Sequence, residues 1–168
     1  IPATSNYYKQ ARLHLASLYI REEEITKAIV AMNEAIENRP NVSEFYEYLA
    51  SIYERDRNFK EAINVLNKAN KNIPNHEQLL FMLGLIYEQD KKRDQAIETM
   101  QKVLRINPQN ANALNYVGYT YAELGIKLSE ALEMIKQAMV LNPADGYITD
   151  SLGWVYYKLG DFYSAETY

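Results

Sequence analysis

Few side chains in this sequence could carry out chemistry. Its 168 residues contain no cysteine and only two histidines, His14 and His76. Without cysteine there is no thiolate nucleophile, no thiolate zinc site and no disulfide. A metal site or proton relay built on imidazole would need the histidines together, and they occupy unrelated positions in the chain. We therefore expect His14 and His76 to be ordinary polar surface groups, and we predict no bound metal.

The carboxylates do not suggest a catalytic pair either. The densest group, Glu22, Glu23 and Glu24, precedes a segment that we expect to be helical, where negative charge is favourable near the helix N-terminus. A solvated turn explains this run better than acid–base catalysis does. The sequence also lacks a dinucleotide-binding GxGxxG, a P-loop and an HExxH motif. We predict that the chain is not an enzyme and binds no cofactor.

Composition narrows the remaining classes of function. The chain is 48% hydrophobic, which argues against disorder, and its net charge is −4. A sequence pI of about 5.3 argues against nucleic acid, because phosphate recognition needs a basic surface. The longest apolar run, Leu79–Tyr87, is much shorter than the roughly 20 residues that span a bilayer. We predict no transmembrane segment. The lack of cysteine suits both the cytoplasm and a bacterial periplasm or cell envelope.

Four series of residues recur along the chain with a spacing of 34 or 35 residues. They are a proline (Pro40, Pro74, Pro108, Pro143), an alanine (Ala28, Ala62, Ala96, Ala131, Ala165), a tyrosine (Tyr19, Tyr53, Tyr87, Tyr121, Tyr156) and a small residue after Leu or Val (Ala16, Ala50, Gly84, Gly118, Gly153). The single extra residue falls in a predicted turn before Ala131, where it leaves both flanking helices in phase. The agreement of four series indicates a structural repeat.

Each repeat is predicted to contain two helices. In the third repeat, Leu80, Leu83 and Tyr87 have the spacing of one helix face, and Ala96 and Met100 begin a second stripe after a polar break. The repeated proline ends the second helix, because it supplies no amide hydrogen and restricts the residue before it. The repeated small residues are expected where the two helices cross, since a bulky side chain there would hold the backbones apart.

Polar residues mark the expected starts of later helices. The residues that follow the repeated prolines are Asn41 and Ser43, Asn75, Asn110 and Asp145, and Asp161 lies inside the fifth repeat. Their side-chain oxygens are suited to accept hydrogen bonds from the free amides of a first helical turn. We predict that each of them caps a helix.

The pattern resembles the tetratricopeptide repeat. It reads Leu83-Gly84-x-x-Tyr87, Ala96-x-x-x-Met100 and Pro108 in the third repeat, and Val117-Gly118-x-x-Tyr121, Ala131-x-x-x-Ile135 and Pro143 in the fourth. Residues 1–8 form a lead-in, and residues 9–168 form one domain with repeats 9–42, 43–76, 77–110, 111–145 and a truncated 146–168. The family's favoured tryptophan at the fourth position is replaced throughout, by Arg12, Tyr46, Leu80, Leu114 and Thr149.

The resemblance implies an all-α fold, a right-handed superhelical solenoid of antiparallel helix pairs. It also implies a concave groove lined by the first helix of each repeat, and therefore a protein–protein interaction scaffold that holds a partner segment. The segment 150–160 is similar to segments of bacterial repeat proteins, some of them envelope lipoproteins. One known sub-type, which grips a terminal carboxylate, uses Lys and Asn where this chain has Leu13 and Ser17, so we set it aside.

The groove positions implied by the resemblance are rich in aromatic residues toward the C-terminal end of the chain. The residues predicted to bind a partner are Phe81, Leu85, Asn112, Asn115, Tyr116, Tyr119, Tyr147, Asp150, Trp154 and Tyr157. Tyrosine and tryptophan are enriched at binding hot spots, and the groove positions carry a mild excess of carboxylates. We therefore expect an apolar or basic–apolar protein or peptide segment as the partner.

Three alternatives remain open at this stage. The aromatics could pack against neighbouring repeats or a further helix. The chain could be the substrate-recognition or regulatory arm of a larger enzyme. It could also self-associate through an uncapped C-terminal end, since terminal repeats normally need a polar cap.

The repeat register can be tested at Ala96. The change Ala96→Asp places a larger charged group at a predicted helix crossing, so we expect it to lower the free energy of unfolding by about 3 kcal/mol or more. Thermal melting followed by circular dichroism measures the effect. An unchanged melting midpoint would rule out the register.

Overall fold

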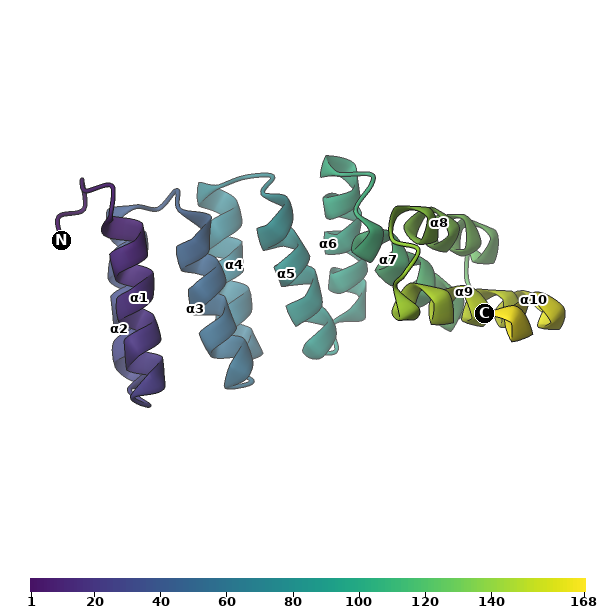
Figure 1. Ribbon diagram of the computed structural model, residues 1–168, viewed down its shortest axis with the longest axis horizontal. Helices are drawn as coiled ribbons and strands as arrows, with labels where there is room; N and C mark the ends of the chain where they lie inside the picture. The colour runs from purple at the N-terminus through teal and green to yellow at the C-terminus, as the bar shows by residue number, and fades with distance from the viewer. The chain divides into compact units, whose positions relative to one another are not determined.

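The computed structural model describes all 168 residues and contains helices but no strand. The elements are α1 (Tyr8–Arg21), α2 (Ile25–Asn38), α3 (Ser43–Arg55), α4 (Phe59–Asn72), α5 (Glu77–Gln89), α6 (Arg93–Ile106), α7 (Ala111–Leu124), α8 (Leu128–Leu141), α9 (Gly146–Leu159) and α10 (Phe162–Thr167). Figure 1 shows them in chain order. The predicted all-α class is confirmed, and each predicted repeat contains two successive helices. No helix is long and apolar enough to cross a membrane.

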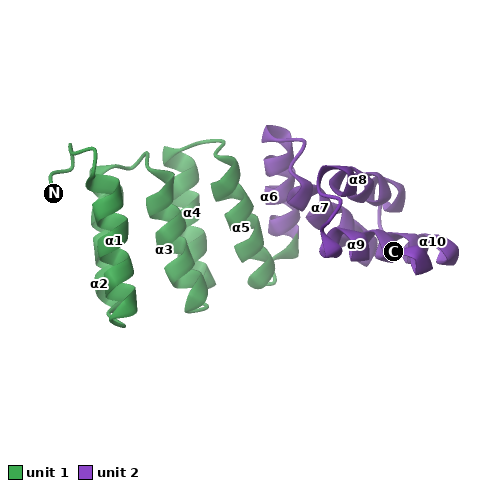
Figure 2. Cartoon of the chain, viewed as in Figure 1, with its two compact units in different colours: residues 1–93 green, residues 94–168 purple.

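The chain divides into two compact units, which Figure 2 colours separately. Unit 1 covers Ile1–Arg93 and contains α1 to α5, whereas unit 2 covers Asp94–Tyr168 and contains nearly all of α6 together with α7 to α10. Within unit 1, α1 packs on α2 and α3 on α4, and within unit 2, α7 packs on α8 and α9 on α10.

The core of unit 1 is built around the repeated small residues. Ala16 and Ala28 are fully buried in the first pair, and Ala50 and Ala62 are fully buried in the second. Larger side chains such as Phe45 then fill the space between successive pairs. Small residues inside and large residues between the pairs give the dense packing that is typical of protein interiors.

Tyr46 shows how one departure from the family pattern is accommodated. Its ring is fully buried, and its hydroxyl donates a hydrogen bond of 2.9 Å to the carbonyl oxygen of Pro40. The same hydroxyl accepts a hydrogen bond of 2.6 Å from the side-chain amide of Asn72. A buried hydroxyl is costly without partners, and here it connects a turn, the first helix and the end of the second helix of one repeat.

Unit 2 contains a tight helix crossing between α7 and α8. A Cβ atom added to Gly118 on α7 would lie 2.8 Å from the Ile135 side chain and 3.0 Å from the Ala131 carbonyl oxygen, both on α8. Tyr121, the repeated tyrosine of α7, is 4% exposed, and its hydroxyl accepts a hydrogen bond of 2.7 Å from Gln101 on α6. The other four repeated tyrosines are half-buried.

The helix caps agree with the sequence at three helices and differ at two. Asn41 and Ser43 are predicted to cap α3, but the N-cap is Val42, whose apolar side chain forms no cap hydrogen bond. Asn110, Asp145 and Asp161 each accept a hydrogen bond from a backbone amide in the following turn. Asn75 was predicted to cap α5 but lies in a left-handed conformation with φ of 59°, and His76 takes its place by accepting from the Leu79 amide at 3.4 Å. Asparagine tolerates a left-handed backbone better than most residues do. Asn75 therefore occupies the left-handed position of the turn, immediately before the N-cap.

The crossing at Gly118 predicts opposite outcomes for two alanine substitutions. Alanine stabilises a helix interior by about 1 kcal/mol relative to glycine, but Gly118→Ala collides with Ile135 and the Ala131 carbonyl. We expect it to lower the free energy of unfolding by about 1–3 kcal/mol. The matched Gly153→Ala on α9 meets neighbouring atoms only at 3.4 Å or more, so it should be neutral or stabilising. Urea denaturation compares the two, and equal effects would disprove the tight crossing.

The start of α10 predicts a dependence on pH. The Asp161 carboxylate accepts two hydrogen bonds from Ser164, one from the hydroxyl and a second from the backbone amide. These bonds, above all the one from the hydroxyl, lower the pKa of Asp161 below its ordinary value of 3.8. Because the carboxylate form is favoured in the folded state, these hydrogen bonds stabilise α10 at any pH above the ordinary pKa of the group. This stabilisation is lost as the pH falls through the lowered pKa of the folded state. NMR titration of the Asp161 carboxyl carbon should give a midpoint below 3.8 in the native chain. Ser164→Ala removes the hydroxyl and should raise the midpoint. An unchanged midpoint would contradict the conclusion that Ser164 lowers the pKa of Asp161.

Candidate protein-binding face

Eight of the ten predicted binding residues lie on two neighbouring helices of unit 2. The helices α7 and α9 are the first helices of the fourth and fifth repeats, and they contact each other. Helix α7 carries Asn112, Asn115, Tyr116 and Tyr119, and helix α9 carries Tyr147, Asp150, Trp154 and Tyr157. We call these eight residues the α7/α9 face.

The α7/α9 face presents unusually exposed aromatic rings. Tyr147 is 83% exposed, Tyr157 is 53% exposed and Tyr119 is 39% exposed, whereas Trp154 and Tyr116 are half-buried. Scattered exposed apolar residues are normal, but grouped aromatic surface is typical of binding sites. The exposure of these rings means that the packing within unit 2 does not use much of their surface.

Three contacting rings form a row over α9 and α10, with Tyr157 in the middle and Trp154 at one end. The Tyr157 ring is 5.5 Å from the Trp154 ring at an interplanar angle of 17°, and the Phe162 ring from α10 meets Tyr157 edge-on at 5.7 Å. The Lys158 ammonium lies 5.3 Å from the centre of the Trp154 ring, within the range of a cation–π contact. Because neighbouring rings fix one another, the aromatic surface is ordered before a partner arrives, which reduces the entropy cost of binding.

Two polar atoms on this face have no hydrogen-bond partner. The indole Nε1 of Trp154 is a buried donor and the side-chain Oδ1 of Asn115 is a buried acceptor, and neither forms a hydrogen bond in the structure. An unsatisfied buried polar atom costs about 1–3 kcal/mol. Because both atoms are buried, neither is accessible to a ligand in this conformation. Asn112 and Asp150 are exposed polar neighbours on the same helices.

The remaining two predicted residues belong to unit 1. Phe81 and Leu85 both lie on α5, where Phe81 is half-buried and Leu85 is 38% exposed. Both residues lie on the first helix of the third repeat, at groove positions like those of the residues on α7 and α9. Because α5 belongs to a different compact unit, their membership of one groove with the α7/α9 face remains a prediction.

Sequence reasoning missed the aromatic residues of α10. Phe162 is 65% exposed and extends the ring stack, and the adjacent Tyr163 is 85% exposed. A signal for Tyr163 was present in the repeat itself, because the other four repeats have a polar residue at its position. Those residues are Thr26, Lys60, Asp94 and Ser129.

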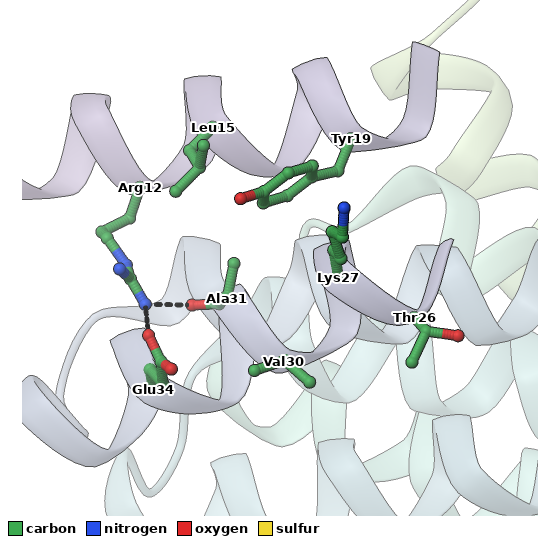
Figure 3. Close-up of a pocket in the computed structure, with 8 residues that line it drawn as sticks. All are labelled: Arg12, Leu15, Tyr19, Thr26, Lys27, Val30, Ala31 and Glu34. Atoms are coloured by element: carbon green, nitrogen blue, oxygen red, sulfur yellow. Dashed lines mark hydrogen bonds and ion pairs between the residues drawn. The ribbon is translucent and has the colours of Figure 1, made fainter. Parts of the chain in front are cut away.

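Unit 1 contains a separate hollow of about 210 Å³ between α1 and α2, which Figure 3 shows. The Arg12 guanidinium lies at one end, where its Nη2 donates to the Ala31 carbonyl at 2.8 Å and to Glu34 at 2.6 Å. Lys27 lies near the other end and is paired with Glu24. Both cations have carboxylate partners, so the hollow offers mainly apolar surface.

The histidines and carboxylates do not assemble into a chemical site. His14 is exposed on α1, whereas His76 serves as the cap of α5. No group of three or more His, Asp or Glu residues is placed where it could hold a metal ion. The candidate site of this chain is therefore the α7/α9 face, which can bind by stacking, apolar contact and hydrogen bonding.

Comparison with solved structures supports the fold. MamA from Desulfovibrio magneticus RS-1 has a TM-score of 0.78 at 19% identity, covering 97% of this chain and 91% of that one. YrrB, described as a TPR protein with an unusual peptide-binding site, has a TM-score of 0.72 at 21% identity, covering 92% of this chain and 79% of that one. The pilF protein of Pseudomonas aeruginosa has a TM-score of 0.77 at 17% identity, covering 96% of this chain and 73% of that one. Identities this low show the fold alone.

The family of the chain follows from a match between its sequence and a family model. No curated protein matches the sequence. The family model of the tetratricopeptide repeat protein 21 C-terminal ARM domain, however, matches residues 2–112, which is well over half of the chain. The spacing of the repeats, the successive helix pairs and this match agree, and the chain belongs to the tetratricopeptide repeat family, in the group that this domain defines.

Proposed function

We propose that the chain is a protein-interaction scaffold and that the α7/α9 face binds a segment of a partner protein. An interaction scaffold is the general function that membership of the family supports. The observation that carries the specific site is the row of rings formed by Trp154, Tyr157 and Phe162, in which Tyr157 and Phe162 are exposed by 53% and 65%. Aromatic side chains of this kind supply most of the binding energy at many protein interfaces.

The charges near the stack favour an apolar or basic–apolar partner. Glu123 and Asp150 are exposed carboxylates on α7 and α9, whereas Lys158 is held over the Trp154 ring. A basic group on the partner would meet the two carboxylates, and an apolar group would cover the rings. Electrostatic complementarity of this kind contributes more to selectivity and association rate than to affinity.

Self-association is a second candidate, and one observation favours it. Helix α10 exposes two aromatic residues, Phe162 and Tyr163, by 65% and 85%, and Tyr168, which follows the helix, is 48% exposed. Exposed apolar surface on a repeat protein can be covered by another copy. Light scattering across a range of protein concentrations distinguishes the candidates, because a strict monomer would exclude self-association. A role as the recognition arm of a larger enzyme is a further form of the same scaffold function.

The proposed face is tested with labelled peptides in a fluorescence polarisation assay. One peptide alternates leucine and lysine, and its counterpart replaces each lysine with glutamate. We expect the basic peptide to bind more tightly. The double change Trp154→Ala and Tyr119→Ala should weaken this binding by about tenfold or more, as the loss of central aromatic residues does at other interfaces. Undiminished binding would overturn the proposed site.

Controls separate binding from folding in this experiment. Trp154→Phe retains an aromatic ring beside Tyr157, so it should retain most of the binding that Trp154→Ala loses and should leave the melting temperature unchanged. Val30→Ala removes a 51% exposed apolar side chain from α2 in unit 1 and should leave binding unchanged. An equal loss from Val30→Ala would mean that the peptide binds apolar surface without selectivity.

A further inference from the structure

The outer side of α8 carries an apolar residue where the other repeats carry charge. Val140 is 81% exposed, and the residues at its position in the first three repeats are Glu37, Lys71 and Arg105. All three of those residues are exposed. The repeats therefore act as internal controls, and they show that neither the helix nor its packing requires an apolar side chain here.

Val140 is not part of the stripe that packs α8 into unit 2. That stripe consists of the buried residues Ala131, Ile135 and Ala138. A residue two positions after Ala138 points to the opposite side of a helix, because each residue turns by about 100°. Val140 is therefore available to a partner without disturbing the contacts that α8 makes with α7 and α9.

A hollow of about 370 Å³ lies beside Val140. It is lined by residues of α8 and of the turn between α6 and α7, namely Pro108, Gln109, Lys136, Gln137, Val140 and Leu141. This volume lies toward the lower end of the range of about 300–1,000 Å³ that is typical of ligand pockets. It is large enough for a single anchoring side chain from a partner.

The equivalent surface of unit 1 has the opposite character. The residues of α4 at the positions of the α8 lining are Asn67, Lys68, Lys71 and Asn72, and all four are exposed and polar. Asn72 is also occupied by its hydrogen bond to Tyr46. The same place in the repeat is thus an ordinary polar helix surface in unit 1 and an apolar hollow in unit 2.

Lys136 determines the charge that the hollow prefers. It is the only charged residue in the lining. Its carboxylate neighbour, Glu133, is 3.6 Å away, and both side chains are substantially exposed, by 44% and 66%. Exposed pairs of this kind are worth little, so the Lys136 ammonium can exchange Glu133 for a carboxylate on a partner.

We propose that the outer side of α8 is a second docking site, at which a partner segment inserts an aliphatic or aromatic side chain beside Val140 and Leu141 and places a carboxylate against Lys136. This site prefers an acidic–apolar segment, whereas the α7/α9 face prefers a basic–apolar one. The two sites use different residues and opposite charge. The failure of one proposal therefore does not imply the failure of the other.

The probes are two peptides that share a Leu-Phe core, one flanked by aspartates and the other by lysines. They are titrated into the isotope-labelled full chain and followed by NMR amide shifts. We expect the aspartate peptide to shift Lys136, Gln137, Val140 and Leu141, and the lysine peptide to leave these signals unchanged. Val140→Glu removes the apolar contact and repels the aspartates, so it should weaken binding of the aspartate peptide by about tenfold or more.

Matched variants make this result specific. Val140→Glu installs the residue type found at Glu37, the same position in the first repeat, so the melting temperature should stay the same. Lys136→Gln should weaken the aspartate peptide severalfold and reduce the salt dependence of its binding. Trp154→Phe, on the α7/α9 face, should leave the aspartate peptide unaffected.

Four outcomes would overturn the proposal. The first is that neither peptide shifts the α8 signals, and the second is that both shift them equally. The third is that the aspartate peptide shifts α7 and α9 in place of α8. The fourth is that the Val140 signal moves with protein concentration alone, because the occupant would then be a second copy of this chain.

Discussion

The close approach of paired helices is the constraint on which the rest of the structure depends. At the crossing of α7 and α8 there is no room for even one added carbon at Gly118, because the Ile135 side chain and the Ala131 carbonyl oxygen are already in contact range. In unit 1 the same condition is met by alanines that are fully buried. Once two backbones are this close, the larger side chains must pack between successive pairs, and this requirement sets which helix faces are buried and which remain free.

That constraint also explains why the chain has a free surface suitable for binding. A helix pair that uses small residues for its own contact does not need its exposed rings for stability. The packing of unit 2 covers little of Tyr147, which is 83% exposed, and it leaves about half of Tyr157 exposed. The contacts of Tyr157 with Trp154 and Phe162 restrict its ring before binding, which lowers the entropy cost of binding. Val140 is likewise not used in the packing of unit 2, since the buried stripe of α8 does not include it.

Most of the fold and part of the site could be predicted from the sequence. The spacing of the prolines, alanines and tyrosines gave the number of helices and their approximate ends, because each residue type has a mechanical role at its position. Individual caps were harder: the cap of α5 is His76 and not Asn75, since the two residues differ in their tolerance of left-handed backbone. The aromatic stack was predicted as separate residues, and Phe162 was missed because its contact with Tyr157 crosses from one helix to the next.

The sequence by itself determined the repeat, the helix pairing and the candidate face, because a periodic pattern of small and large residues can be satisfied in only one register. The tertiary structure alone decided which polar atoms lack a partner and where a hollow forms. Trp154 is one tryptophan among many aromatic residues in the sequence, but only its surroundings bury the indole N–H without an acceptor. The hollow at Val140 likewise depends on a turn that lies about thirty residues earlier in the chain, and only folding brings that turn against α8.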